Sequence, residues 1–424
     1  MSAPDGRAAD AMRIAIVRHS GYPEDMHVRR DALALRDAGF EVDLICDRRP
    51  GKPLTERVDG ICVVRIPPQH RRGGVGRYLF EYTAFPLAAA VILAIRSIWR
   101  RYRWIEINNM PDWLVVAAIV PKLLGARVAL YSREDMPRLL ASDHDLSPRH
   151  PAVRLLRTIQ VACCRFADRV ITTQEFARQD LIEQGIPANN VVAVPNAPDE
   201  GAFLARLPEE RSVTLRAPRN IGSFRLVTHG TLVKRYGIQT LLQAVELLHD
   251  AIPGLHLEIV GDGEYRPALE DLVERLQLRP YVTFTGFLLD YETVAPRLLE
   301  ADLGVVPIWT DFQLCNKLVD YLLLGIPAIT CESRVLRTYL GDEAVQFVTP
   351  KNAPALADAI LLLYREPSRR AALAAAGRAA YLKHFSWDQA RHQYLALYTG
   401  NDHHLTVPQS DHQTHARALE RSTA

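Results

Sequence analysis

Short apolar runs alternate with longer amphipathic segments through most of this chain. The first run, at residues 13–20, is followed by a polar loop, by a helix predicted at 31–40 and by a second apolar run at 41–47. Gly39 ends that helix, and strand, helix and strand in this order predict a right-handed unit with parallel strands. The alternation returns twice more, so we expect residues 1–200 to form one doubly wound α/β domain.

A second domain is predicted after a break in this pattern. Residues 201–222 are charged, contain proline and glycine and show no long period, so we expect an interdomain linker there. The alternation then restarts, which predicts a second parallel α/β domain at 223–385. A short aromatic helix is expected at 386–400. The polar, histidine-rich residues 401–424 predict a disordered tail, with metal binding by its histidines as the alternative.

Composition sets broad limits on function. The 424 residues carry a formal net charge of +2, which gives no reason to expect a nucleic-acid partner. The six cysteines lack the paired spacing of a zinc site, and we expect reduced thiols in a cytoplasmic protein. The N-terminus is polar and does not resemble a signal peptide.

One segment favours contact with a membrane surface. The apolar run Ala84–Ile95 is shorter than the roughly 20 residues that span a bilayer, so we expect no membrane-spanning segment. From Arg65 to Arg103, however, there are eight arginines and a single acidic residue, Glu81. A helix with basic ends and an aliphatic and aromatic body can lie on an anionic membrane. The alternative is a core helix beneath a basic surface loop.

Two loops of the second domain have features of a phosphate site. Gly230 ends a strand, a helix begins near Gly237, and Lys234 and Arg235 lie between them. A helix N-terminus exposes unpaired N–H groups and attracts phosphate, which nearby cations strengthen. The alternative is a solvated surface turn. A second strand–Gly-x-Gly–helix turn includes Gly263 but lacks the third glycine of a dinucleotide fingerprint.

The stretch FQLCNKLVDYLLLGIPAIT, residues 312–330, carries further candidates at the start of a helix. Lys317 and Asp320 are three positions apart and share a helix face, so a local ion pair is one interpretation. The other is a ligand site, because this helix begins at the same sheet edge as the Gly230 loop. There, Asp320 can accept both hydroxyls of a ribose while Asn316 and Lys317 face a diphosphate.

Taken in order, these motifs resemble a known family. The chain is similar to the retaining GT-B nucleotide-sugar glycosyltransferases (group 1, or family 4-like), and especially to bacterial members that build surface polysaccharides and glycolipids. The resemblance covers about residues 12–400. Its strongest motifs are HGTLVKRYG, IVGDGEYRPALEDL, VTFTGFL, LCNKLVDYLLLGIPAIT and FSWDQARHQYLALY.

The resemblance implies two Rossmann-like domains that face each other across a cleft, with the donor held mainly by the second. Asp320 matches the family glutamate that holds the ribose, and Phe287 ends the strand whose loop borders the base. It implies no cofactor and no metal, because basic residues and helix N-termini neutralise the leaving diphosphate. The expected donor-binding residues are Gly230, Lys234, Arg235, Gly263, Phe287, Asn316, Lys317 and Asp320.

Several positions depart from the family pattern. Phe312 stands where the first carboxylate of a Glu-x7-Glu motif is usual, and the adjacent Asp311 is the expected substitute. Thr231 and Tyr236 replace the usual arginine and lysine. Arg133 matches a family histidine near the donor sugar, yet a guanidinium stays protonated and cannot act as a base; the leaving phosphate can accept the proton instead. The candidate catalytic residues are Arg133, Glu134 and Asp311.

We therefore expect transfer of a sugar, with retention and without metal, from a nucleoside diphosphate sugar to a glycan or lipid-linked acceptor. The expected setting is the cytoplasm, at the inner face of the cell membrane, in polysaccharide or glycolipid synthesis. The alternatives are a catalytically weak or inactive binding protein on the same scaffold and a nucleotide-sugar epimerase. The expected acceptor-side residues are Gly21, Arg29, Arg30, Asn109 and Asp112.

Overall fold

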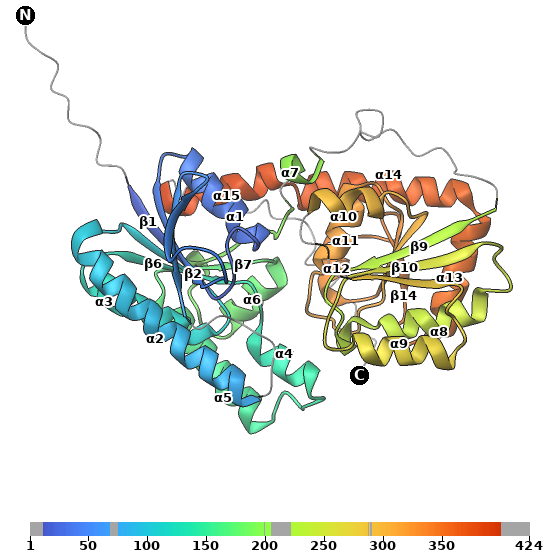
Figure 1. Cartoon of the computed structure of the whole chain (residues 1–424), viewed down its shortest axis with the longest axis horizontal. Helices are drawn as coiled ribbons and strands as arrows, with labels where there is room; N and C mark the ends of the chain where they lie inside the picture. Colours follow the sequence, from blue (N-terminus) through green and yellow to red (C-terminus); the bar gives the residue numbers. More distant parts are fainter. Residues whose placement is uncertain are drawn as a thin grey trace, which may run out of the picture.

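The computed structural model describes residues 12–67, 75–198, 200–204, 222–286, 288 and 291–399. It contains two α/β domains side by side, the first drawn from blue to green and the second from yellow to red (Figure 1). Two long helices at the C-terminal end run along one side of both domains. The predicted fold of two parallel-sheet domains is confirmed.

The first domain is built on an eight-stranded sheet in the order β3-β4-β2-β1-β5-β6-β7-β8. All neighbouring strands are parallel except β3, which is antiparallel to β4. The central strands are buried on both faces, because helices cover both sides of the sheet. The strands are β1 (Arg13–Arg18), β2 (Glu41–Asp47), β3 (Thr55–Val58), β4 (Ile61–Ile66), β5 (Trp104–Asn108), β6 (Arg127–Ser132), β7 (Arg169–Thr172) and β8 (Val191–Ala193).

The helices of this domain lie on both faces of its sheet. One core cluster joins the sheet to α2, η1 and α5, and another joins it to α1 and to the last helix, α15. The helices are α1 (Met26–Asp37), α2 (Val75–Arg100), η1 (Asp112–Ala118), α3 (Ile119–Leu123), α4 (Met136–Asp143), α5 (Pro151–Phe166), α6 (Glu175–Glu183) and η2 (Ala188–Asn190).

The second domain has a parallel six-stranded sheet in the order β11-β10-β9-β12-β13-β14. The strand order reverses between β9 and β12, the place where ligands bind in such sheets. Its strands are β9 (Phe224–His229), β10 (Leu255–Val260), β11 (Val282–Gly286), β12 (Leu303–Val306), β13 (Ala328–Cys331) and β14 (Gln346–Val348). Its helices are η4 (Lys234–Tyr236), α8 (Ile238–Leu248), α9 (Arg266–Arg275), α10 (Tyr291–Leu298), α11 (Asn316–Leu323), α12 (Arg334–Tyr339) and α13 (Ala353–Arg365).

Helices α14 (Pro367–His384) and α15 (Trp387–Thr399) connect the two domains (Figure 1). α15 packs on the first domain through buried side chains that include Tyr394 and Tyr398. Both phenols donate to the carboxylate of Glu106 in β5, Tyr394 at 2.6 Å. Burial raises the pKa of Glu106. The chain thus returns to the first domain, as the resemblance implies.

Some local boundaries differ from the sequence-based expectation. α1 begins at Met26, inside the predicted loop, because the Asp25 side chain caps it by accepting the Val28 N–H at 3.2 Å. Helix α7 (Glu200–Leu204) occupies the start of the predicted linker. The remaining linker residues 205–221 and the predicted tail 401–424 lie outside the described residues.

Helix α2 is much longer than the apolar run that predicted it. Its segment Leu79–Arg100 has a mean hydropathy of 1.5 and is, by length and composition, able to cross a membrane. Core helices of soluble proteins meet the same criterion. One side of α2 packs on the first domain through Phe85, Ala89 and Leu93. The apolar run Ala84–Ile95 therefore underestimated the length of this helix, and whether α2 spans a membrane is not decided by length and composition.

Candidate functional site

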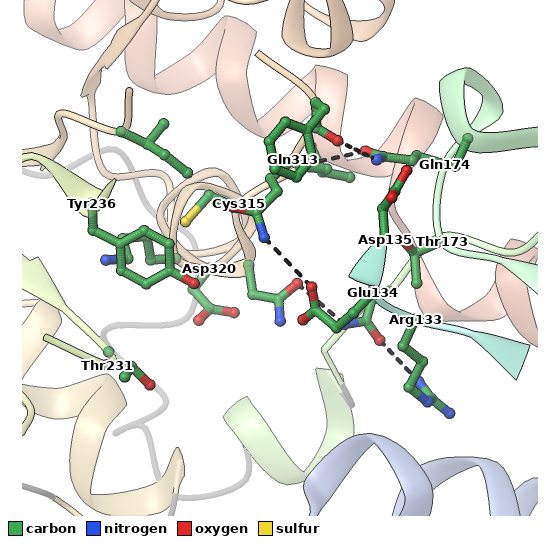
Figure 2. A pocket seen from close by; sticks show the side chains of 18 of the residues that line it. Arg133, Glu134, Asp135, Thr173, Gln174, Thr231, Tyr236, Gln313, Cys315 and Asp320 are labelled. Atoms are coloured by element: carbon green, nitrogen blue, oxygen red, sulfur yellow. Dashed lines mark hydrogen bonds between the residues drawn. The ribbon is translucent and has the colours of Figure 1, made fainter. Parts of the chain in front are cut away.

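A cavity of about 360 Å³ lies between the two domains, beyond the carboxyl ends of their central strands. Figure 2 shows Glu134, Tyr236 and Asp320 around it. Across the domain boundary, Gln174 donates to the Phe312 carbonyl and Gln313 donates to Glu134. One wall, here called the second-domain wall, comprises Gly230, Asn316, Lys317 and Asp320. The other, the first-domain wall, comprises Arg133, Glu134, Gln174 and Asn196.

In the second-domain wall, Asp320 is held by a histidine. His229, the last residue of β9, places its Nε2 3.0 Å from Asp320 Oδ2 and its Nδ1 3.0 Å from the Tyr321 hydroxyl. The imidazole can therefore donate to Asp320 through Nε2, while the Tyr321 hydroxyl also donates to the Val227 carbonyl at 3.2 Å. Asp320 is buried yet lines the cavity, so its carboxylate is held in place at the cavity surface and can accept hydrogen bonds there. No ion pair joins it to Lys317, contrary to one of the interpretations of the sequence.

Lys317 supplies a buried cation to the same wall. Its Nζ lies 4.3 Å from the centre of the Tyr236 ring, and its aliphatic chain runs beside Gly230. Gly230 has a φ of +102°, which glycine adopts without strain. Burial lowers the pKa of Lys317 below its ordinary 10.5. A negatively charged ligand would raise this pKa again, because its attraction for the ammonium group offsets the lost hydration.

Asn316 begins α11 and reaches the other domain. Its Nδ2 lies 3.3 Å from His27 Nε2, and its Oδ1 accepts from Asn196 Nδ2 at 3.2 Å. Burial lowers the pKa of His27 to about 3, so the ring is neutral and Nε2 can accept a hydrogen bond. These three side chains join the domains at the N-terminus of α11, where free N–H groups favour an anion.

Glu134 is the carboxylate of the first-domain wall. It follows β6 and its Oε2 lies 3.4 Å from Nε2 of Gln313, in the second domain. Burial raises the pKa of Glu134. The Glu134 carboxylate thus reaches, from the opposite domain, the loop that contains Phe312.

Gln174 fixes that loop against the first domain. It follows β7, donates through Nε2 to the Phe312 carbonyl at 2.7 Å and accepts the Leu314 N–H at 3.1 Å. Phe312 itself is buried and lines the cavity. Two hydrogen bonds from the Gln174 side chain therefore attach this loop of the second domain to the first-domain wall.

Arg133 also lines the cavity, but its guanidinium is directed into the first domain (Figure 2). It donates to Asp31, to Asn108 Oδ1 at 2.6 Å and to Asn196 Oδ1 at 3.4 Å. Its Cζ lies 3.7 Å from the centre of the Tyr131 ring. Arg133 therefore orients Asn196 and the strand ends around it, and proton transfer is excluded by its permanent charge.

Two expected donor-binding cations lie outside the cavity lining. Arg235 forms an ion pair with Asp143, at the end of α4, and Lys234 lies 3.7 Å from Asp145. Both acidic residues belong to the first domain. Both cations of η4 therefore pair with carboxylates of the first domain and do not join Lys317 in the cavity lining. We call the position of these two ion pairs the rim.

Two further residues expected at the site do not line the cavity, and the structure does not test a third. Asp311 is exposed and pairs with Arg334 at 2.8 Å, so it does not replace the missing carboxylate. Gly263 is required by a close approach, since a Cβ there would lie 2.1 Å from the Leu232 carbonyl oxygen. Phe287 lies outside the described residues.

The five expected acceptor-side residues lie in the first domain and do not line this cavity, although the Asn109 side chain hydrogen bonds the backbone of Arg133 and Glu134. Gly21 faces Arg49, Arg29 pairs with Asp59, and Arg30 is buried against Asp31 and Trp387. Asn109 donates to Asp112 at 2.8 Å. Burial raises the pKa of Asp112 to about 7.

Other cavity residues were missed in the sequence. Each lies at the end of a strand or in the loop after it, a position that predicts a site only once the strand order is known. They are Gln174, Asn196, His229 and Gln313. His27 of α1, which contacts Asn196 and Asn316, was missed as well.

Comparison with known proteins gives the family. Residues 25–197 match the family described as glycosyl transferase 4-like domain, and residues 223–366 match the family described as glycosyl transferases group 1. A GDP-mannose-dependent alpha-(1-6)-phosphatidylinositol dimannoside mannosyltransferase of Mycobacterium tuberculosis is 27% identical over 275 residues, 64% of this chain and 67% of that protein. The lipopolysaccharide core biosynthesis glycosyltransferase LpsE of Rhizobium meliloti is 29% identical over 173 residues, 41% of this chain and 48% of its own.

A solved structure shows the same fold. Sucrose-phosphate synthase of Thermosynechococcus elongatus superimposes with a TM-score of 0.73 and 21% identity, covering 92% of this chain and 99% of that one. Its two facing domains are the GT-B arrangement seen here. With a 4-like domain followed by a group 1 domain, the chain belongs to the GT-B glycosyltransferases.

Proposed function

We propose that this glycosyltransferase moves a sugar from a nucleoside diphosphate sugar to a glycan or lipid-linked acceptor, with retention of configuration and without a metal. The observation that carries the proposal is the second-domain wall: a buried carboxylate, a buried cation and a helix N-terminus on one side of the interdomain cavity. These three groups suit a ribose and a diphosphate. The first-domain wall opposite offers the Glu134 carboxylate and the amides of Gln174 and Asn196, which can hydrogen bond a sugar.

The donor would bind with its ribose hydroxyls at Asp320 and its diphosphate near Lys317 and Asn316. Asp320, fixed by His229, accepts hydrogen bonds without moving. Lys317 has little hydration to lose on binding because it is already buried. Both features favour preorganised electrostatic stabilisation of a charged ligand.

In the proposed reaction, the bond between the anomeric carbon and the β-phosphate oxygen breaks, and its electron pair stays on the diphosphate. The acceptor hydroxyl forms the new bond on the same face and releases its proton to a phosphate oxygen. Lys317 and the α11 N-terminus stabilise the growing negative charge. Glu134 would hold hydroxyls of the transferred sugar.

The charge on the leaving group would be neutralised by protein groups. Among the described residues, no three His, Cys, Asp or Glu side chains are grouped as metal ligands. Lys317 provides the positive charge where the diphosphate is expected. We expect transfer to continue in excess EDTA at an unchanged rate, and loss of activity that Mg²⁺ or Mn²⁺ restores would contradict this.

Relatives guide the choice of substrates. Their names include GDP-mannose-dependent enzymes that act on phosphatidylinositol mannosides and lipopolysaccharide core glycosyltransferases. We therefore infer that GDP-mannose is the first donor to test and that the acceptor carries a lipid. All six cysteines are free thiols, which supports a cytoplasmic setting.

The test is a transfer assay with GDP-mannose, UDP-glucose, UDP-galactose and ADP-glucose, with and without a lipid extract as acceptor. We expect one donor to yield a glycolipid product whose new linkage has the donor's anomeric configuration. A changed sugar nucleotide formed without acceptor would indicate an epimerase. Nucleotide binding without turnover of any donor would indicate an inactive scaffold, the alternative raised by Phe312 and Arg133.

A further inference from the structure

An unusually apolar surface covers one side of the first domain. Of the sixteen large apolar side chains exposed in the described structure, eleven belong to α2, η1 and α3, and a twelfth, Leu124, directly follows α3. We call this surface the α2–α3 face. Soluble proteins seldom expose so many contiguous apolar groups without a partner. Its principal residues are Leu87, Val91, Ile95 and Trp99 of α2 with Ile119 and Leu123 of α3.

The α2–α3 face is continuous and about as long as α2 itself. Leu87, Val91, Ile95 and Trp99 recur every four residues and form one stripe, on the side opposite the buried core positions. From Leu79 to Trp99 the stripe is about 30 Å long at 1.5 Å per residue. η1 and α3 pack beside α2 and widen the stripe into a face. Trp99 is 81% exposed and Leu123 is 82% exposed.

The charges around this face are positive. Both acidic residues of α2 and η1, Glu81 and Asp112, are buried. Exposed arginines lie at its ends: Arg77, in the first turns of α2, is paired with the buried Glu81 at 2.7 Å, and Arg101 and Arg103 directly follow the helix. In an antiparallel pairing of two copies along α2, these arginines would face each other and repel. An anionic surface is the complementary partner.

We propose that the α2–α3 face docks on an anionic lipid bilayer, with α2 lying in the plane of the membrane interface. Its other side is fixed to the domain: Arg96 pairs with Asp43 of β2 at 2.7 Å, and Phe85 packs in the core. Spanning the bilayer would break these contacts. Phe80 and Trp99, exposed near the two ends, suit the interface, where aromatic side chains concentrate.

Docking through the α2–α3 face would fix the orientation of the interdomain cavity relative to the membrane. β4 ends and α2 begins at the carboxyl edge of the first sheet, the edge that faces the other domain. There, Trp113 Nε1 donates to the Tyr82 carbonyl at 2.7 Å and joins α2 to η1. A lipid-linked acceptor held in the same bilayer would meet the cleft from this edge. That consequence rests on the proposed function, whereas the docking itself does not.

The experiment is flotation of the full-length protein with vesicles. Equimolar phosphatidylglycerol and phosphatidylcholine are compared with phosphatidylcholine alone, at low and high salt. We expect binding to the anionic vesicles that weakens with salt. The variant Leu87→Gln/Val91→Gln/Ile95→Gln should bind the vesicles at least tenfold more weakly, because it removes three exposed apolar side chains from the face. Glutamine is a good helix former, so α2 should stay intact.

A matched control is Leu247→Gln/Leu382→Gln, which changes exposed leucines of α8 and α14 and should bind as the unmodified protein does. Thermal unfolding verifies that both variants fold. Equal vesicle binding by the triple variant, or no binding by the unmodified protein, overturns the proposal. The proposal is also overturned if the unmodified protein self-associates and does not bind vesicles, and if the triple variant alone abolishes this self-association. The face would then be an interface between copies of the chain. Failure of the proposed function would leave vesicle binding unchanged.

Discussion

The two walls of the cavity are built in different ways. The second-domain wall takes Asn316, Lys317 and Asp320 from the first turns of one helix and adds Gly230 from the end of one strand. The first-domain wall collects Glu134, Gln174 and Asn196 from three separate loops. Local helix geometry fixes the former. Hydrogen bonds to the opposite domain and to Arg133 fix the latter.

This difference implies a division of labour. A wall set by one helix keeps its geometry when the domains move, and so suits the part of the donor that is bound first. A wall held by cross-domain contacts, such as that of Gln174 with Phe312, forms only when the domains are together. We therefore expect the second-domain wall to determine nucleotide binding and the first-domain wall to determine turnover.

The largest predicted effect is on Asp320. Asp320→Ala removes the acceptor for the ribose hydroxyls and leaves His229 without its partner, so we expect the Kd of the matching nucleoside diphosphate to rise at least 100-fold. Isothermal titration calorimetry measures this. The matched control is Asp311→Ala in the same domain, an exposed carboxylate that should change the Kd less than twofold. An equal loss in both variants would contradict the assignment.

The next effect separates the walls. Glu134→Gln keeps the shape of the side chain but removes its charge, so we expect kcat to fall roughly 10- to 100-fold, the value of a hydrogen bond to a charged group. The Kd of the nucleoside diphosphate, which has no sugar, should stay the same. Steady-state kinetics measures kcat and calorimetry measures the Kd. The control is Glu175→Gln, outside the cavity, which should change neither value. A weaker nucleotide affinity with normal kcat would reverse the two roles.

A pH effect follows from Lys317. Burial lowers its pKa in the free protein, and a bound diphosphate would raise it. Below the free-protein pKa the ammonium form is already present; above that value binding must take up a proton. Affinity should therefore fall as pH rises through this pKa, by up to about tenfold per unit. Titrations from pH 7 to 10 should show this slope, which Lys317→Met removes and Lys351→Met, a surface lysine, keeps.

The smallest effect concerns the rim. Asp143→Asn frees Arg235, whose exposed ion pair is worth about 1 kcal/mol at most. If the arginine then turns to the diphosphate, affinity rises by up to about fivefold. Asp145→Asn, whose contact with Lys234 is longer and more exposed, should have no measurable effect. A lower Kd in the Asp145 variant alone would contradict this prediction, because it would show that Lys234, and not Arg235, reaches the diphosphate.

These walls also explain what could be predicted from the sequence. Gly230, Asn316, Lys317 and Asp320 followed from strand ends and one helix start, because local spacing determines their positions. His229 was missed because its contact is with a residue 91 positions away. Lys234 and Arg235 were expected on the diphosphate, but Asp143 and Asp145 of the other domain compete for them.

The sequence also left the position of α2 open. Its apolar run fitted both a core helix and a membrane-surface helix, since periodicity does not show how many sides are covered. The structure covers only the side that contains Phe85 and Leu93. Similarly, Asp311 and Phe312 are adjacent in sequence, yet the buried one lines the cavity and the charged one is exposed.

The most direct test of the second-domain wall is thermal unfolding with UDP, GDP, ADP, dTDP and, as a comparison, NAD. A diphosphate at 100 times its Kd should stabilise the protein by about 2.7 kcal/mol. We predict that one of the nucleoside diphosphates does so, that NAD does not, and that Asp320→Ala abolishes the shift while Asp311→Ala keeps it. No stabilisation by any nucleotide, or the same stabilisation in Asp320→Ala, would contradict the account.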